Sequence, residues 1–172
     1  VYTEEENPNN PEIEKIIGAY LPKEEGFQKV VLKAMNYSVL AGGKRLRPML
    51  MLETYRMFGG RGKEIEPFMA ALEMIHTYSL VHDDLPAMDN DEYRRGRKTT
   101  HVVYGEAFAI LAGDALLNEA FYLCARETER LTEVCTEQSG RLGLIIACVK
   151  AQRILAECAG KDGMIKGQEI DL

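Results

Sequence analysis

Residues 64–86 read EIEPFMAALEMIHTYSLVHDDLP, and the assignment of the fold rests on this stretch. Its apolar residues recur at intervals of three and four, which is the period of one helix face and not of a strand. The residues of this stripe are Phe68, Ala71, Leu72, Ile75 and Tyr78. The pattern predicts a long helix from about Glu64 towards Asp84. Pro86 ends it, because a proline inside a helix removes a hydrogen bond and clashes with the preceding turn.

The same spacing recurs on both sides of this stretch. It predicts further helices over residues 11–21, 27–41, 48–57, 105–128, 138–160 and 163–172, separated by glycines and prolines. The second of these has an apolar stripe that begins at Phe27. Residues 85–103 are polar and loop-like, and no hairpin signal lies between strand-like segments. We therefore expect an all-α helical bundle in a single domain, without repeats or linkers.

The composition is typical of an ordinary soluble globular protein, with 46% apolar and 28% charged residues. The net charge of −6 argues against a nucleic-acid-binding protein, which usually has a basic surplus. The longest uncharged apolar run, about residues 142–149, is far shorter than the ~20 residues that span a bilayer. Residues 1–10 are polar and acidic, unlike a signal peptide or a basic transit segment.

The cysteines indicate a reducing compartment. Cys124, Cys135, Cys148 and Cys158 show no CxxC or Cys/His spacing, and each lies in an apolar, helix-patterned segment. This favours buried free thiols over disulfides or a zinc site. Together with the absence of a leader pattern at residues 1–10, it predicts a cytoplasmic protein.

Three aspartates, Asp83, Asp84 and Asp89, gather at the end of the long predicted helix. Carboxylates at a helix C-terminus oppose the helix dipole, which costs stability unless a cation is present. Magnesium typically takes one or two carboxylates and shares its other positions with water and substrate phosphates. An uninterrupted helix would point Asp83 and Asp89 in different directions, but unwinding at Pro86 lets Asp89 fold back. These residues alone leave a metal site and merely exposed carboxylates equally open.

Two basic clusters accompany the aspartates. One is Arg94, Arg95, Arg97 and Lys98, and the other is Lys44, Arg45 and Arg47 in a glycine-hinged turn before Pro48. Guanidinium groups pair bidentately with phosphate oxygens, and the free N–H groups of a helix start attract anions. The set contains what is needed to bind a diphosphate, through metal on one side and arginine on the other. Solvated surface charge is the alternative.

His76 lies two helical turns before Asp83 and therefore on the same helix face. We expect it to face the acidic site and to contact a phosphate. His82 and His101 are weaker candidates, whereas Asp114, Asn118 and Glu119 are expected to make structural polar contacts.

Five motifs in order resemble the trans-isoprenyl diphosphate synthases, or polyprenyl synthetases. They are GGKRLRP at 42–48, HTYSLVHDDLPAMDND at 76–91, RRG at 94–96, GEAFAILAGDALL at 105–117 and GQEID at 167–171. The spacing of Asp83 and Asp89 is similar to that of the bacterial farnesyl and the plant-type geranylgeranyl enzymes. The resemblance implies helices around a deep central cavity and a homodimer. It also implies head-to-tail condensation of isopentenyl diphosphate with an allylic diphosphate, dimethylallyl or geranyl.

The resemblance also implies roles for individual residues. Asp83 and Asp89 would bind Mg²⁺, with Mn²⁺ as a substitute, and through it the allylic diphosphate, with Asp84 supporting them. Arg94 would contact the allylic diphosphate. The residues implied to hold isopentenyl diphosphate are Lys44, Arg47, His76 and Arg95, and those implied to lie near the allylic site are Gln168 and Asp171. An aromatic residue at the position of Tyr78 tends, in this family, to limit the product to fifteen carbons.

Further motifs of the family, a second aspartate-rich motif and a lysine-threonine pair, would follow the Gly-Gln segment, and they do not occur before Leu172. We therefore expect residues 1–172 to be the N-terminal portion of one all-α domain and to be inactive alone. A farnesyl diphosphate synthase is the leading hypothesis. The alternatives are a geranylgeranyl or longer-chain synthase and a non-catalytic regulatory subunit of the same fold.

Overall fold

The computed structural model describes residues 11–134 and 138–171. Its helices are α1 Pro11–Ala19, α2 Lys29–Val39, α3 Leu46–Met57, α4 Glu66–Asp83, α5 Thr100–Tyr104, α6 Glu106–Val134, α7 Gln138–Ala159 and α8 Met164–Asp171. A short antiparallel hairpin joins β1, Tyr93–Arg94, to β2, Arg97–Lys98. The predicted all-α class is confirmed, and the long helix ends before Pro86 as predicted. The polar segment 1–10 and Leu172 lie outside the described residues.

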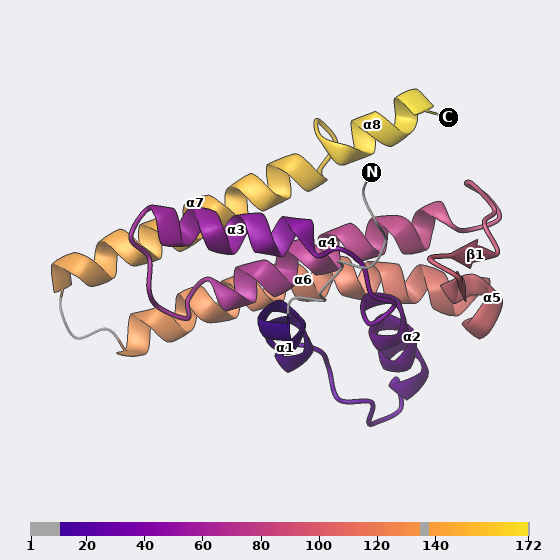
Figure 1. Cartoon of the computed structure of the whole chain (residues 1–172), viewed down its shortest axis with the longest axis horizontal. Helices are drawn as coiled ribbons and strands as arrows, with labels where there is room; N and C mark the ends of the chain where they lie inside the picture. Colours follow the sequence, from indigo (N-terminus) through magenta and orange to yellow (C-terminus); the bar gives the residue numbers. More distant parts are fainter. Residues whose placement is uncertain (1–10, 135–137, 172) are drawn as a thin grey trace, which may run out of the picture.

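Helix α4 is the central element of the fold. It packs against α6 along much of its length and also contacts α1, α2 and α3 (Figure 1). Its buried apolar residues are Phe68, Met69, Ala70, Ala71, Met74, Ile75, Tyr78 and Val81. A helix that is surrounded by other helices must be apolar on nearly every side. This explains why α4 contains the run FMAALEMI rather than a single narrow stripe.

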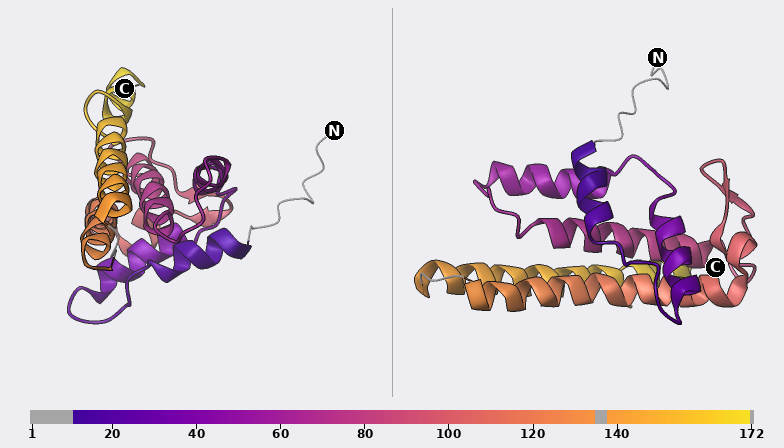
Figure 2. Two further views of the ribbon diagram at one scale, coloured as in Figure 1. Left: turned by 90° about the vertical axis from the view of Figure 1, so that its left-hand side faces the viewer. Right: turned by 90° about the horizontal axis from the view of Figure 1, so that it is seen from below.

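The remaining helices are arranged around α4 and α6. Helices α6 and α7 run side by side in opposite directions, and α1 and α2 cross one side of the α4–α6 pair (Figures 1 and 2). Helix α8 extends from the end of α7 towards the same end of the molecule as the end of α4 (Figure 1). It has no buried residue, so its place is set by few contacts. This arrangement brings α8 near the acidic turn that follows α4.

The hairpin between α4 and α5 was not predicted, and neither was α5, because residues 85–103 were assigned to a loop. Its turn is Arg95-Gly96, and both residues have positive φ, 53° and 74°. Two-residue hairpin turns of type I′ need positive φ at both central positions. Gly96 was therefore the residue in the sequence that indicated a hairpin turn. The turn was not recognised because Arg95, before it, is a residue type that rarely adopts the left-handed conformation.

Two further expectations were wrong. Phe27 precedes α2 and is fully exposed, because the chain turns at Gly26, which has a φ of 84°, and the helix starts only at Lys29. Cys158 is exposed, whereas Cys124 and Cys148 are buried free thiols as predicted. Burial raises the pKa of Cys124 to about 12 and that of Cys148 to about 11, so both remain protonated at neutral pH. The prediction for Cys135 lies outside the described residues.

Helix α6 is long and apolar enough to cross a membrane, judged by length and composition. This is weak evidence, because the core helix of a soluble protein has the same properties. The apolar face of α6 is a core face here, with Ala109, Ala112, Leu116, Ala120 and Leu123 fully or almost fully buried. Packing within the fold therefore explains the apolar residues on this face of α6, whereas Phe108, Ile110 and Leu111 on the same helix are exposed.

Candidate functional site

The chain reverses direction directly after α4, at the acidic motif. The backbone N–H of Asp89 donates to the carbonyl oxygen of Asp83 at 2.9 Å, and that of Asn90 donates to Leu85 at 3.1 Å. Pro86 lies in the exposed turn between them. The structure thus brings Asp89 back to the end of α4 beside Asp83, in the way that the proline break predicted.

This turn gathers negative charge around Asp83. Partial burial and the charge of Asp89 raise the pKa of the Asp83 carboxyl, with a smaller contribution of the same sign from Asp171. The side chain of Gln168 donates a hydrogen bond to Oδ1 of Asp83 and acts in the opposite direction. Both α8 residues that were expected near the allylic site therefore lie at the acidic turn. Carboxylates this close repel one another, and a bound cation would relieve that repulsion.

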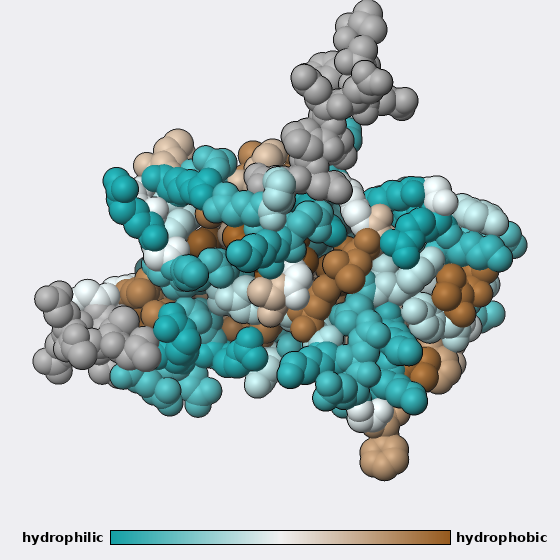
Figure 3. Space-filling model, turned by 60° about the horizontal axis from the view of Figure 1, so that its bottom comes forward, coloured by the Kyte–Doolittle hydropathy of each residue, from teal (hydrophilic) through white to brown (hydrophobic). Residues whose placement is uncertain are grey.

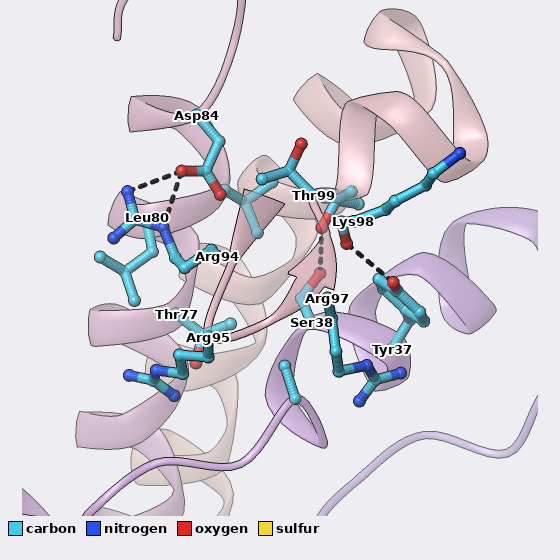
Figure 4. A pocket seen from close by; sticks show the side chains of 13 residues that line it. Tyr37, Ser38, Thr77, Leu80, Asp84, Arg94, Arg95, Arg97, Lys98 and Thr99 are labelled. Carbon is cyan, nitrogen blue, oxygen red and sulfur yellow. Dashed lines mark hydrogen bonds and ion pairs between the residues drawn. The ribbon is translucent and has the colours of Figure 1, made fainter. Parts of the chain in front are cut away.

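Asp84 differs from its neighbours because it is buried, with 4% of its surface exposed. Its Oδ1 accepts a hydrogen bond from Nε of Arg94 at 2.7 Å and forms an ion pair with Nη2 at 2.6 Å (Figure 4). Burial raises the pKa of Asp84, and the Arg94 guanidinium opposes this shift. Asp84 thus holds Arg94 at the end of α4, while Asp83 and Asp89 are left for other ligands.

The acidic turn is the first half of the site. The second half is a cavity with cationic side chains at the start of α3. It has a volume of about 530 Å³. Its lining includes Lys44, Arg47, His76 and Arg95, the four residues implied to hold isopentenyl diphosphate, together with Arg45 and Glu73. These side chains come from the loop before α3, from the first turn of α3, from α4 and from the hairpin. Residues that are far apart in the sequence therefore form one cavity in which positive charge predominates.

His76 was expected to face the acidic site, and this expectation was wrong. Two helical turns separate it from Asp83, so the two residues share a face but lie about 10 Å apart along the axis. Its neighbours are instead the cationic cavity and Arg47. Burial, with the nearby Arg47 charge, lowers the pKa of the His76 imidazole. The neutral ring keeps one N–H donor for an anion in the cavity.

The hairpin connects the two halves of the site. Arg94 pairs with Asp84 at the end of α4, whereas Arg95 lies farther along the helix and donates a hydrogen bond to the carbonyl oxygen of Gly42 (Figure 4). Gly43, with a φ of 138°, leaves room for this guanidinium, because a Cβ there would lie 2.4 Å from its Nη1. Arg94 and Arg95 are adjacent in the sequence, but the first reaches the end of α4 and the second reaches the loop before α3.

Tyr37 of α2 anchors this hairpin, and the sequence did not single it out. Its hydroxyl donates to the carbonyl oxygen of Lys98 at 2.7 Å, and the guanidinium of Arg97 lies 4.5 Å from the centre of its ring. Arg97 also donates to the carbonyl oxygen of Leu40 at 3.2 Å. A tyrosine on a helix face has no local signal of such a contact, because its partner lies 61 residues away.

The weaker candidates have structural surroundings. Nε2 of His82 lies 3.1 Å from the carbonyl oxygen of Ile110 and 3.8 Å from a carboxylate oxygen of Asp114. His101 contacts the hydroxyl of Thr99 through Nδ1 at 3.1 Å. Asn118 is exposed, and burial raises the pKa of the half-buried Glu119. Tyr78 is buried and packs edge-on against His82, with 5.8 Å between ring centres.

The donor set at the acidic turn fits magnesium in the presence of a phosphate ligand. Within residues 11–134 and 138–171, three or more His, Cys, Asp or Glu side chains do not converge closely enough to hold a metal alone. Asp83 and Asp89 offer two carboxylates, which is the number that magnesium takes from a protein when water and substrate phosphates supply the other ligands. A diphosphate beside Arg94 would provide these missing oxygens.

The protein is thus an all-α bundle with an acidic turn and a cationic cavity along α4. Residues 28–156 match the model of the family described as polyprenyl synthetase, and the chain belongs to this family. It is 47% identical over 169 residues to the farnesyl diphosphate synthase of Geobacillus stearothermophilus, an alignment that covers 96% of this chain and 52% of the relative. It is 46% identical over 140 residues to the chloroplastic geranylgeranyl pyrophosphate synthase of Catharanthus roseus, covering 81% of this chain and 36% of that protein.

Solved structures agree with this assignment. The apo structure of an FPP/GFPP synthase from Zymomonas mobilis is similar with a TM-score of 0.75 and 39% identity, and the match covers 95% of this chain and 54% of that one. A geranyltransferase from Legionella pneumophila has a TM-score of 0.78 and 32% identity, covering 95% and 56%. The chain spans about half the length of the curated relatives that it matches.

Proposed function

We propose that the chain belongs to a prenyltransferase that condenses isopentenyl diphosphate head-to-tail with dimethylallyl or geranyl diphosphate to form farnesyl diphosphate. One observation carries this proposal: two charged clusters of different chemistry lie along α4 and share one hairpin. The first has the carboxylates of Asp83 and Asp89 near Arg94, which suits a diphosphate bound with metal. The second has Lys44, Arg47 and Arg95, which suit a diphosphate bound directly.

At the acidic turn, Asp83 and Asp89 would hold magnesium together with the allylic diphosphate. Magnesium bound there supplies positive charge that stabilises the departing diphosphate. Arg94 adds a charge that does not titrate near neutral pH, and the buried Asp84 keeps this guanidinium aimed at the site. The preorganised charge favours heterolysis of the allylic C–O bond, with both electrons leaving on the diphosphate oxygen.

In the cationic cavity, Lys44, Arg47 and Arg95 would hold the diphosphate of isopentenyl diphosphate, with His76 donating a hydrogen bond. The electron pair of the isopentenyl double bond then forms the new C–C bond to the allylic carbon. A proton is lost afterwards, and the released diphosphate is the base that accepts it. No side chain acts as a nucleophile, so the protein contributes binding, orientation and exclusion of water.

Product length is the finer part of the proposal. The chain resembles relatives named as farnesyl and as geranylgeranyl synthases. A fifteen-carbon product is supported by Tyr78, a bulky, buried residue five positions before Asp83 and about 7.5 Å along α4. A geranylgeranyl or longer-chain product is the second candidate. We also expect a cytoplasmic homodimer, which light scattering and fractionation can test.

The test uses protein expressed from its complete gene, incubated with labelled isopentenyl diphosphate, geranyl diphosphate and magnesium. After dephosphorylation, chromatography should show farnesol, and removal of metal with EDTA should abolish its formation until magnesium or manganese is restored. Asp89→Ala should lower kcat by at least about a hundredfold, in the range of a lost transition-state contact. Glu92→Gln, an exposed acid of the same segment, serves as the control.

Each outcome has a defined meaning. Geranylgeraniol as the main product would support the second candidate. A well-folded protein without any condensation would contradict prenyl transfer and favour a regulatory subunit. A near-normal rate for Asp89→Ala in saturating magnesium would contradict the assigned metal site.

A further inference from the structure

Arg45 lies between two cavity cations in the sequence, yet its side chain is committed elsewhere. The residue is 4% exposed. Its Nη1 donates to Glu73 at 2.7 Å, its Nε donates to Glu14 at 2.8 Å, and its Nη2 donates to Glu14 at 3.2 Å. Nη2 also donates to the carbonyl oxygen of Val39 at 2.8 Å. All three guanidinium nitrogens therefore have protein partners, and these partners take four of the five N–H groups.

These contacts join four elements at one point. Glu14 belongs to α1, Val39 ends α2, Arg45 immediately precedes α3, and Glu73 lies in α4. The carbonyl group of Val39 lies in the last turn of α2, where it lacks a partner within the helix, so Arg45 also completes that helix end. The ion pair with Glu73 is almost wholly buried, with 2% and 3% of the two side chains exposed.

The backbone at Arg45 adds a second observation. Its φ is 47°, in the left-handed region that residues with a Cβ rarely adopt. Such a conformation persists only where the surroundings enforce it, and it is typical of functional segments. The side-chain contacts of Arg45 provide this constraint. They also set the direction of the chain at the two neighbouring cavity residues, Lys44 and Arg47.

Glu73 contributes to the same cavity from the other side. It lines the cavity and lies three residues before His76, so the two share a face of α4. Its carboxylate pairs with Arg45, which also pairs with Glu14, so the cations of the cavity that lack such a pairing among the described residues are Lys44, Arg47 and Arg95. A buried ion pair adds little net stability compared with an apolar pair, and its best-attested role is to specify one arrangement.

We propose that the buried Arg45–Glu73 pair positions Lys44 and Arg47 for the diphosphate of isopentenyl diphosphate, without touching this substrate itself. The inference rests on the proposed function, and it assigns a positioning role that acts on one of the two substrates. The allylic site depends on Asp83, Asp89 and Arg94, which are held by other contacts.

The experiment compares variants of the protein expressed from its complete gene. Glu73→Gln keeps the shape and one acceptor but removes the charge, and Arg45→Lys keeps the charge but cannot make all the contacts of the guanidinium. Each should raise KM and Kd for isopentenyl diphosphate about tenfold, the effect of one misplaced charge-assisted hydrogen bond. KM for geranyl diphosphate and kcat should change less than about twofold.

Matched controls come from an exposed ion pair in α3. Arg56 and Glu53 are 2.7 Å apart with 46% and 60% of their side chains exposed. Glu53→Gln and Arg56→Lys make the same chemical changes outside the site, and they should leave all constants unchanged. If Glu73→Gln does not fold, Glu14→Gln removes the partly exposed partner of Arg45 and should give the same selective effect at smaller size.

The outcomes separate this inference from the proposed function. Unchanged KM and Kd for isopentenyl diphosphate in folded variants would overturn the positioning role. A parallel loss of kcat, of both KM values and of thermal stability would also overturn it, because that is the signature of a general structural role. A wild-type protein that binds isopentenyl diphosphate by calorimetry but forms no product would contradict only the proposed function, and the Kd comparison would still decide the inference.

Discussion

At the scale of single residues, the site depends on which charged groups remain free. Arg45 and Asp84 carry the same charges as their neighbours Lys44 and Asp83. Both are buried, and both are paired with an opposite charge. A buried charge is stable only with such a partner. Arg45 and Asp84 therefore have structural partners, whereas the adjacent Lys44 and Asp83 are available to a ligand.

Tyr78 provides a prediction on product length. Replacing it with alanine removes a large buried side chain about 7.5 Å along α4 from Asp83, so a growing prenyl chain gains space. Tyr78→Ala should shift the main product from farnesyl to geranylgeranyl diphosphate or longer, measured by chromatography of the dephosphorylated products. Tyr78→Phe keeps the ring and should keep the fifteen-carbon product. If the folded, active alanine variant still forms only that product, the limit to chain growth lies elsewhere.

His76 provides a prediction on pH. Burial and Arg47 lower its pKa in the folded protein below the value of 6.5 that applies to the unfolded chain. From pH 6.5 down to the folded pKa, the unfolded state binds more protons, so the free energy of unfolding falls as the pH falls. His76→Gln should therefore reduce the slope of this free energy between about pH 7.5 and 5.5, measured by denaturant titration.

The control for this pH effect is His101→Gln, a change outside the cationic cavity. It should retain the slope that His76→Gln loses. The carboxyl groups with raised pKa values, Asp83 and Asp84, are present in both proteins, so their contribution cancels in the comparison. Equal slopes in wild type and His76→Gln would contradict the lowered pKa.

At the scale of elements, the hairpin β1–β2 is the part that links the two halves of the site. It carries Arg94 towards α4 and Arg95 towards the loop before α3 (Figure 4). Its own ladder is very short, so its position depends on contacts with α2 through Tyr37 and Leu40. Two-stranded hairpins have little stability by themselves. The orientation of both arginines therefore depends on a helix that lies outside the motifs.

Tyr37→Phe tests this dependence. The change removes the hydrogen bond to Lys98 while it keeps the ring beneath Arg97, at a cost of about 0.5–1.5 kcal/mol for one hydrogen bond. KM for both diphosphates should rise together, by roughly two- to tenfold, because Arg94 and Arg95 share the hairpin. Tyr93→Phe alters an exposed ring on the same hairpin and should have no effect. A rise in only one KM would show that the two arginines are positioned independently.

At the scale of the whole molecule, apolar side chains reach the surface between charged areas (Figure 3). On α7 the exposed residues Leu142, Ile146 and Val149 recur at intervals of four and three, which makes one helix face apolar. Ile165 and Ile170 of α8 are exposed as well. Apolar faces of this kind normally pack against another part of a protein. We therefore expect α7 and α8 to be covered in the active assembly.

The 172-residue chain expressed alone should self-associate and form no prenyl product. Exposed apolar faces drive association. No product is expected because the two carboxylates of the acidic turn and the cationic cavity are only part of a complete active site. Light scattering and the condensation assay measure both properties. Leu142→Lys with Ile146→Lys should reduce the association, whereas Ala156→Lys, at an exposed alanine of α7, should not. Turnover by the chain at its intact mass would contradict the prediction.

Features that are local along the chain could be predicted from the amino-acid sequence. The spacing of apolar residues predicted the helices, and Pro86 predicted the turn that returns Asp89 to Asp83, because helix periodicity and proline geometry act within a few residues. The motifs also indicated which charged segments to consider. The composition of the acidic turn was thus readable before any contact was known.

How these segments divide into sites became visible only from the packing of the helices. His76 shares a helix face with Asp83 but belongs to the cationic cavity, and Arg45 lies beside Lys44 but is buried against Glu73. Glu73 lies 28 positions from Arg45 in the sequence. Lys98 lies 61 positions from Tyr37, and Gly42 lies 53 positions from Arg95. Burial and pairing depend on which helices meet, and spacing within one helix carries no information about that.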